Sequence, residues 1–154
     1  MSDRIIVATF DNTNAAYETA RAMKDLKQAG TAGTADFKLK TGVMIKKDDR
    51  GNVSLLEGKE RPLLGTAVGT TAGLLIGLLG GAPGAALGAA LGATTGLSTD
   101  AVMAAVDTDF VDDVKRELLP GMTAIIVEAN EGSTRAVDDL VASHGGHVHR
   151  QEAA

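Results

Sequence analysis

Residues 4–14 read RIIVATFDNTN and residues 123–133 read TAIIVEANEGS, so one pattern occurs near both ends of the chain. In each stretch a run rich in β-branched residues, typical of a strand, precedes Asn, Asp, Ser or Thr, the residues that cap helix N-termini. An amphipathic helical pattern follows each stretch and ends at glycine, at Gly30 in the first half and Gly145 in the second. Each half therefore predicts a strand followed by a capped helix.

A second strand follows each predicted helix, over residues 36–46 and 147–151. The first of these should turn back through 49–52 (DRGN) into a short strand at 53–56, because Asp, Gly and Asn suit a tight reversal. Two βαβ units in tandem predict an α/β (α+β) fold, a ferredoxin-like sandwich with both helices on one face of the sheet. The Ile-Ile-Val runs, apolar on both faces, should form the central strands.

The face of this sheet that the two helices leave open needs a cover of its own. It would present alternate residues of the same apolar strands, such as Ile5 and Val7 or Ile6 and Ala8. An exposed apolar face of this size marks an interaction surface. A second subunit and the residues inserted between the two halves are the two candidates for covering it.

The inserted residues 62–99 form an uncharged run of 38 residues that holds ten of the 19 glycines. Eight of these glycines recur every four residues, on either side of a turn at 80–83 in which Pro83 suits the first position of a new helix. They are Gly65, Gly69, Gly73, Gly77, Gly84, Gly88, Gly92 and Gly96. Residues four apart share a helix face, so each helix would present a groove of bare backbone.

Glycine costs a helix about 0.8–1 kcal/mol relative to alanine, so four in one helix cost roughly 3–4 kcal/mol. A flexible Gly/Ala linker would lack both the strict period and the leucines around it. The spacing therefore predicts a glycine-zipper helical hairpin, in which small residues let two backbones approach closely.

Two environments suit this hairpin. Its first helix, 63–79, would be about 26 Å long, against a hydrocarbon core of about 30 Å, and its second, 84–99, has only three leucines. Neither helix is an independent membrane span, but the uncharged tip permits insertion as a pair with both flanks on the cytoplasmic side. Equally, the hairpin could lie in the core of a soluble assembly. Both cases predict a homo-oligomer larger than a dimer, with membrane lipid as a further partner in the first.

An amphipathic helix is predicted over 109–119, with Phe110, Val111, Val114 and Leu118 on one face, and the Pro-Gly pair at 120–121 ends it. The domain organisation that follows is a discontinuous ferredoxin-like domain, residues 1–61 and 120–154, and an insertion, residues 62–119, that holds the hairpin and this helix.

Composition excludes several functional classes. The chain has no cysteine, hence no disulfide framework, thiol nucleophile or cysteine-ligated metal. Its net charge of −5 and its aromatic content of 3% argue against a nucleic-acid partner.

The first residues lack the basic region, long apolar region and cleavage site of a secretory signal. We therefore expect a location in the cytoplasm or at the cytoplasmic face of the inner membrane.

No catalytic, cofactor-binding or metal-binding residue is predicted. His147 and His149 would share a face of the last strand, and His144 lies close by, but spacing fixes no carboxylate beside them. Residues 48–52 (DDRGN) lack the later glutamate of an EF-hand and suit a hairpin turn. The glycine-rich run 65–71 lacks the lysine of a phosphate-binding loop. These patterns indicate a protein that is not an enzyme.

Residues 107–111 (DTDFV) and 118–127 (LLPGMTAIIV), with the later Gly145-Gly146-His147-Val148, resemble a bacterial family known as domain of unknown function twelve sixty-nine. The resemblance covers roughly residues 4–150. It implies a Gly/Ala-rich hairpin, an α/β fold and association with a membrane, and it brings no activity.

The function that these observations predict is a non-enzymatic, self-assembling protein that oligomerises through the zipper hairpin. The alternative is a small-ligand or regulatory binding module, which would use the open sheet face as its site and the hairpin only for dimerisation.

Overall fold

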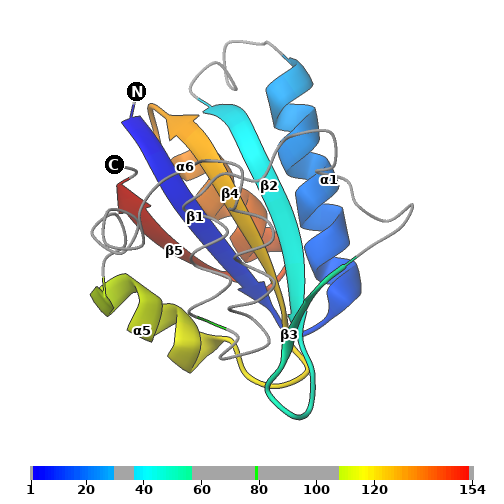
Figure 1. The fold of residues 1–154 in the computed structure, drawn as a ribbon. Coiled ribbons are helices and arrows are strands. Elements are labelled where there is room, and N and C mark those ends of the chain that lie inside the picture. Colours follow the sequence, from blue (N-terminus) through cyan, green and yellow to red (C-terminus); the bar gives the residue numbers. More distant parts are fainter. Residues whose placement is uncertain (1, 30–36, 57–78, 80–107, 153–154) are drawn as a thin grey trace.

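A computed structural model of the chain describes residues 2–29, 37–56, 79 and 108–152. In this part the chain is a mixed α/β structure, with three helices and a five-stranded antiparallel sheet (Figure 1). The eight zipper glycines lie outside the described residues, as does all of 62–99 except Leu79. The elements are β1 (Ser2–Phe10), α1 (Thr13–Ala29), β2 (Phe37–Lys47), β3 (Val53–Leu55), α5 (Thr108–Glu117), β4 (Thr123–Glu131), α6 (Arg135–Ser143) and β5 (His147–Glu152).

The strand order in the sheet is β3-β2-β4-β1-β5, with every neighbouring pair antiparallel. Strands β1 and β4, which carry the Ile-Ile-Val runs, lie inside the sheet, as their two-sided apolar pattern predicts. The two halves of the chain are interleaved. Strand β4 separates β1 from β2, and β1 separates β4 from β5, so neither half forms a sheet of its own.

Helices α1 and α6 lie side by side on one face of the sheet (Figure 1). Between them and the sheet lies a buried group of side chains, here named the helix-face cluster. Its members are Ile6, Ala8, Phe10, Ala16, Ala20, Met23, Phe37, Leu39, Met44, Ile125, Val127, Ala129, Val137 and Val141. Ala16, Ala20 and Met23 recur at a spacing of three to four residues on one face of α1, and all three are fully buried.

Hydrogen bonds confirm the predicted start of α1 and the predicted end of α6, whereas Thr134 at the start of α6 makes no side-chain cap bond. Asn12 caps α1, its Oδ1 accepting the Ala15 amide at 2.8 Å. Helix α6 ends where Gly145 takes a φ of +77°, a conformation that glycine adopts without a steric penalty. The amides of Gly145 and Gly146 then donate to the carbonyls of Ala142 and Val141, which is a Schellman motif.

The β2–β3 hairpin turns at 48–52, as the Asp, Gly and Asn content predicts. The Asp48 carboxylate accepts the amides of Arg50 and Asn52, each at 2.9 Å, and Gly51 has a φ of +84°. The Asp48 carboxylate thus stabilises the turn.

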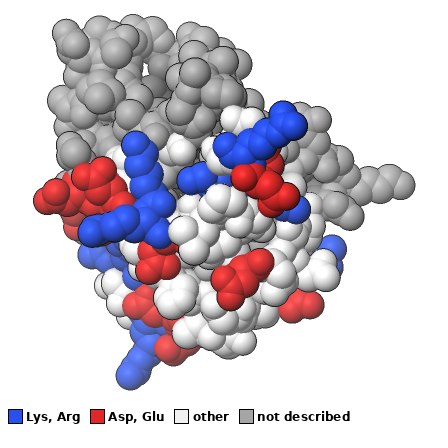
Figure 2. All heavy atoms as spheres, turned by 90° about the horizontal axis from the view of Figure 1, so that it is seen from below, with Lys and Arg blue, Asp and Glu red and all other residues white. Residues whose placement is uncertain are grey.

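Charges of both signs are interspersed around an uncharged area at the lower end of the molecule, seen in Figure 2.

Strand β4 is longer than its sequence pattern predicts. The Asn130–Ser133 region had the composition of a helix cap, but β4 continues to Glu131. Its last residues pair with Ser2 to Arg4 of β1 on one side and with Phe37 to Leu39 of β2 on the other. Ladders on both sides of the strand outweigh the local turn preference of Asn.

Candidate functional site

The second face of the sheet, opposite α1 and α6, carries its own buried side chains, here named the second-face cluster. The members are Ile5, Val7, Ile45, Val53, Leu79, Phe110, Val111, Val114, Leu118, Ala124 and Ile126. Alternation along β1 separates the two faces, because Ile5 and Val7 belong to this cluster while Ile6 and Ala8 belong to the other. The prediction that both faces of the central strands are apolar is confirmed.

Helix α5 covers part of this second face with the four apolar side chains that its sequence pattern placed on one side. Phe110, Val111, Val114 and Leu118 are all buried, and the next residue, Leu119, is 58% exposed. The ten residues of α5 contribute three of these side chains and Leu118, the residue after the helix, contributes the fourth, while the polar side of the helix faces outward. The chain supplies this part of the cover itself.

The C-terminal end of α5 is tied to β2 through Lys47. The Lys47 ammonium donates to the Leu118 carbonyl at 3.2 Å, where a cation also complements the negative end of the helix dipole. Backbone bonds join the same lysine to the loop that follows, since the Gly121 amide donates to the Lys47 carbonyl and the Lys47 amide to the Met122 carbonyl. These three contacts fix where α5 ends on the sheet.

Leu79 is the one residue of the uncharged run that the structure describes, and it lies in the second-face cluster. Only 5% of it is exposed, and it shares this cluster with Ile5, Val7 and Ile126 of the central strands. The predicted hairpin thus has at least one point of attachment to the α/β part. This contact, together with α5, is the candidate functional site, because it connects the sheet to the segment predicted to assemble.

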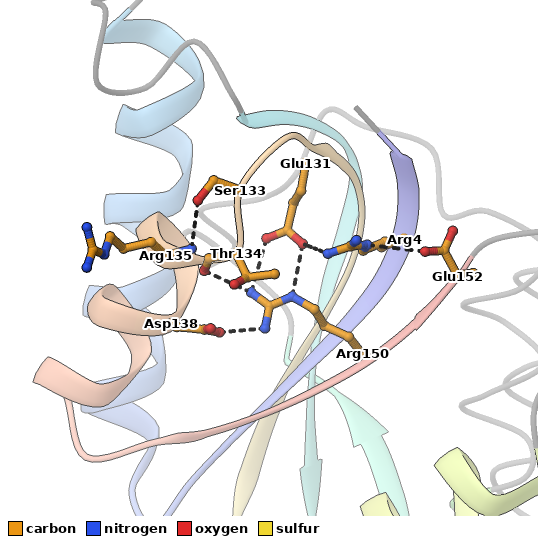
Figure 3. A network of polar contacts seen from close by, with 8 residues as sticks. All are labelled: Arg4, Glu131, Ser133, Thr134, Arg135, Asp138, Arg150 and Glu152. Atoms are coloured by element: carbon orange, nitrogen blue, oxygen red, sulfur yellow. Dashed lines mark hydrogen bonds and ion pairs between the residues drawn. The ribbon is translucent and has the colours of Figure 1, made fainter.

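A network of charged side chains lies at the other end of β4, and its central residue is Glu131 (Figure 3). The Glu131 side chain is fully buried. Arg150 of β5 binds it with two hydrogen bonds, from Nε to Oε2 at 2.9 Å and from Nη2 to Oε1 at 3.1 Å. Arg4 of β1 lies 3.5 Å away on the other side. Arg150 also donates to Asp138 and to the Thr134 carbonyl, so the network joins three strands to the start of α6.

The charge on Arg150 is stabilised by these partners. Burial alone would lower its pKa, but the hydrogen bonds and charges of Glu131 and Asp138 outweigh burial and raise the pKa of Arg150 above its ordinary value. The guanidinium therefore stays charged wherever the chain is folded, and each of its three nitrogens donates to a group of the protein. This arrangement holds β4, β5 and α6 together.

Sequence reasoning did not find this network. Arg4, Glu131 and Arg150 are far apart along the chain, and no local spacing signals that they meet. The only signal was compositional, since a Glu in a central strand needs a partner once it is buried.

The three histidines do not form a metal site in the described residues. His144 lies at the end of α6, with Nδ1 2.9 Å from the Leu140 carbonyl and Nε2 3.7 Å from Glu18. His147 and His149 share a face of β5 in the register, opposite Thr9 and Val7 of β1. Over the part of the chain that is described, no three His, Asp or Glu side chains are grouped as metal ligands.

The glycines predicted to form a helix-packing interface cannot be placed relative to one another, because all eight lie outside the described residues. The zipper remains a prediction at those positions. No helix within the described ranges is long and apolar enough to cross a bilayer.

Residues 61–153 match the family model described as protein of unknown function DUF1269. The match spans more than half of the chain. The chain belongs to this family. The resemblance seen in the motifs around 107–127 is thereby confirmed. Neither the curated proteins nor the solved structures contain a match.

The DUF1269 match begins one residue before the uncharged run and continues through α5, β4, α6 and β5. Strand β1, which lies between β4 and β5, falls outside it. The family region of this chain therefore builds its sheet around a strand from the first half.

Proposed function

We propose that this DUF1269 chain is a non-enzymatic, self-assembling protein whose α/β part holds a glycine-zipper hairpin. We further assign the α/β part to the ferredoxin-like arrangement. The order β2-β4-β1-β5 with α1 and α6 on one face supports this assignment, since two interleaved βαβ units produce that order.

The observation that carries the proposal is the burial of Leu79 on the second face of the sheet. At 100° per residue, position 79 lies about 200° around a helix from Gly77. A helix that packs Leu79 against the sheet would direct Gly77 away from it. The part of the groove near Gly77 would then be available to another helix, either the second arm of the hairpin or an arm of another copy.

The same burial weighs against the ligand-binding alternative, which needs an open second face. Val7 and Ile126 are fully buried there, and α5 packs in the same cluster. The burial of Leu79 also favours assembly in water over insertion into lipid. The hairpin tip, 80–83, follows Leu79 directly, so insertion of the tip into a bilayer would draw Leu79 out of its cluster. We place the assembly in water and not in lipid on this reasoning.

The zipper is tested by a substitution for which groove packing and simple hydrophobic clustering predict opposite results. Gly73→Leu adds apolar surface, which should strengthen nonspecific clustering, but it puts a bulky side chain where two backbones are proposed to touch. We expect Gly73→Leu to raise the protein concentration needed for assembly at least tenfold, measured by sedimentation velocity without detergent. Leu75→Ala, off the groove, is the control and should matter less.

Two outcomes would contradict the proposal. One is a parent chain that sediments as a single monomeric species. The other is a Gly73→Leu chain that assembles as well as the parent at equal concentration. Flotation with lipid vesicles separates the two environments, because a lipid-inserted hairpin floats with the vesicles and a soluble assembly does not.

A further inference from the structure

The two edges of the sheet are built differently. At the β2 edge, β3 covers only Ile45 to Lys47, and the rest of β2 has no outer partner among the described strands. The register of β2 against β4 is interrupted between Leu39 and Thr41. Lysines stand in this strand at 38, 40, 46 and 47. Bulges and lysines are the devices by which natural edge strands avoid pairing with other chains.

The β5 edge has neither a bulge nor a lysine, and its charged residues are Arg150 and Glu152. Its six residues pair with β1 in an unbroken register from Arg4–Glu152 to Thr9–His147. The strand contains no proline and no lysine. Its one arginine, Arg150, is turned toward Glu131 and Asp138, which neutralise it. In the described part of the chain, no strand pairs with the outer side of β5.

We propose that β5 pairs antiparallel with β5 of a second copy, around a two-fold axis at His149. The two sheets then become one continuous sheet of ten strands, twice the five of a single chain. This inference rests on the proposed self-assembly and adds a second interface to it. One interface joins two copies, and the zipper extends the assembly beyond the dimer.

The register follows from face matching and charge. Residues directly opposite each other in an antiparallel pair share a face, so a two-fold axis must pass through a residue and not between two. An axis at His149 or at Arg150 pairs five of the six residues of β5, more than an axis at any other residue of the strand. An axis at Arg150 would place two guanidinium groups directly opposite each other, which is destabilising. An axis at His149 instead places Val148 opposite the partner's Arg150, and His147 opposite the partner's Gln151.

The absence of cysteine makes this register measurable by cross-linking. Directly opposite residues have Cβ atoms about 4.5–5.5 Å apart, close to the separation of about 3.5–4.5 Å in a disulfide. Under mild oxidation, His149→Cys should therefore give a covalent dimer on a non-reducing gel. His147→Cys is the matched control and should stay largely monomeric, because its opposite residue is the partner's Gln151.

A double variant tests the same register without changing His149. His147→Cys combined with Gln151→Cys should restore the covalent dimer. Equal cross-linking of the two single histidine variants would indicate random collision and overturn the proposal. Failure of both His149→Cys and the double variant to cross-link would also overturn it.

Sedimentation equilibrium separates this interface from the zipper. In the Gly73→Leu chain, we expect the large assembly to fall to a dimer held by β5. Adding His149→Lys should raise the dimer dissociation constant about fivefold or more, since like charges then lie opposite each other. An equal mixture of that variant with a His149→Glu counterpart should restore the dimer.

The two proposals fail in different ways in this experiment. A Gly73→Leu chain that is already monomeric overturns the β5 interface and leaves the zipper standing. A Gly73→Leu chain that keeps the full assembly overturns the zipper, and the cross-linking pattern then decides the β5 interface independently.

Discussion

Glu131 illustrates how a single buried charge joins distant parts of this chain. Its carboxylate has no exposed surface, and both of its oxygens accept hydrogen bonds from Arg150 of β5. Arg4 of β1 lies 3.5 Å from Oε2. A buried pair of this kind contributes little net stability compared with an apolar replacement, but breaking one partner leaves an uncompensated charge. The network is therefore a constraint on how β1, β4, β5 and α6 meet.

Glu131→Ala should lower the free energy of unfolding by about 3–5 kcal/mol, because it leaves the part-buried Arg150 with only Asp138 and the Thr134 carbonyl as partners. Glu152→Ala is the control. Glu152 is 72% exposed and lies 3.6 Å from Arg4, so its loss should cost less than about 1 kcal/mol. Urea unfolding followed by circular dichroism measures both values, and equal losses would show that the network is not specifically stabilising.

Gly146 is required for close packing, in contrast to its neighbour Gly145. A Cβ at position 146 would lie 2.5 Å from Phe10 Cε1 and 2.8 Å from Val141 Cγ1. Gly146→Ala should therefore cost roughly 1–3 kcal/mol through overpacking. Gly145→Asn should cost only a few tenths of a kcal/mol, because Asn tolerates the left-handed conformation and nothing lies within 4 Å of a Cβ there. Thermal melts of both variants test this, and a similar shift in the two would contradict it.

At the scale of elements, what could be predicted from sequence depended on whether the signal was local. Helices α1 and α6 follow from caps, 3–4 spacing and terminal glycines, and β1 and β4 from apolar runs. For α5, the pattern of Phe110, Val111, Val114 and Leu118 identified the buried side but not its partner. That partner is the face of a sheet built from both halves of the chain, so no local pattern encodes it. The Arg4–Glu131–Arg150 network was missed for the same reason.

The packing of α5 against the sheet is tested by two adjacent leucines. Leu118 is 1% exposed and belongs to the second-face cluster, whereas Leu119 is 58% exposed. Leu118→Ala should reduce the free energy of unfolding by about 2–5 kcal/mol, and Leu119→Ala by less than about 0.5 kcal/mol. Both are measured by urea unfolding. A Leu118→Ala chain as stable as the parent would mean that α5 does not contribute to the cooperative core.

For the whole molecule, folding of the sheet depends on strands from both halves of the chain. The DUF1269 match covers 61–153, yet β4 and β5 within it are not neighbours, because β1 lies between them. Residues Ile5 to Phe10 of β1 are at most 1% exposed and contribute to the clusters on both faces. Removing β1 therefore exposes both clusters to water and leaves β4 and β5 without their β1 hydrogen bonds.

We accordingly expect residues 61–154 alone to lack a cooperative unfolding transition, although they contain the entire family region. The matched comparison is the full chain with 62–99 replaced by a short polar linker. That chain keeps all the described strands and helices. Of the second-face cluster it loses only Leu79, whose removal should cost about 2–5 kcal/mol. It should still melt cooperatively, at a lower temperature than the parent.

Adding residues 1–60 in trans to the 61–154 fragment should restore β1 and with it a cooperative melt. A cooperative melt of the isolated fragment would mean that β4 and β5 can pair without β1, and the interleaved sheet would then not be the folding unit.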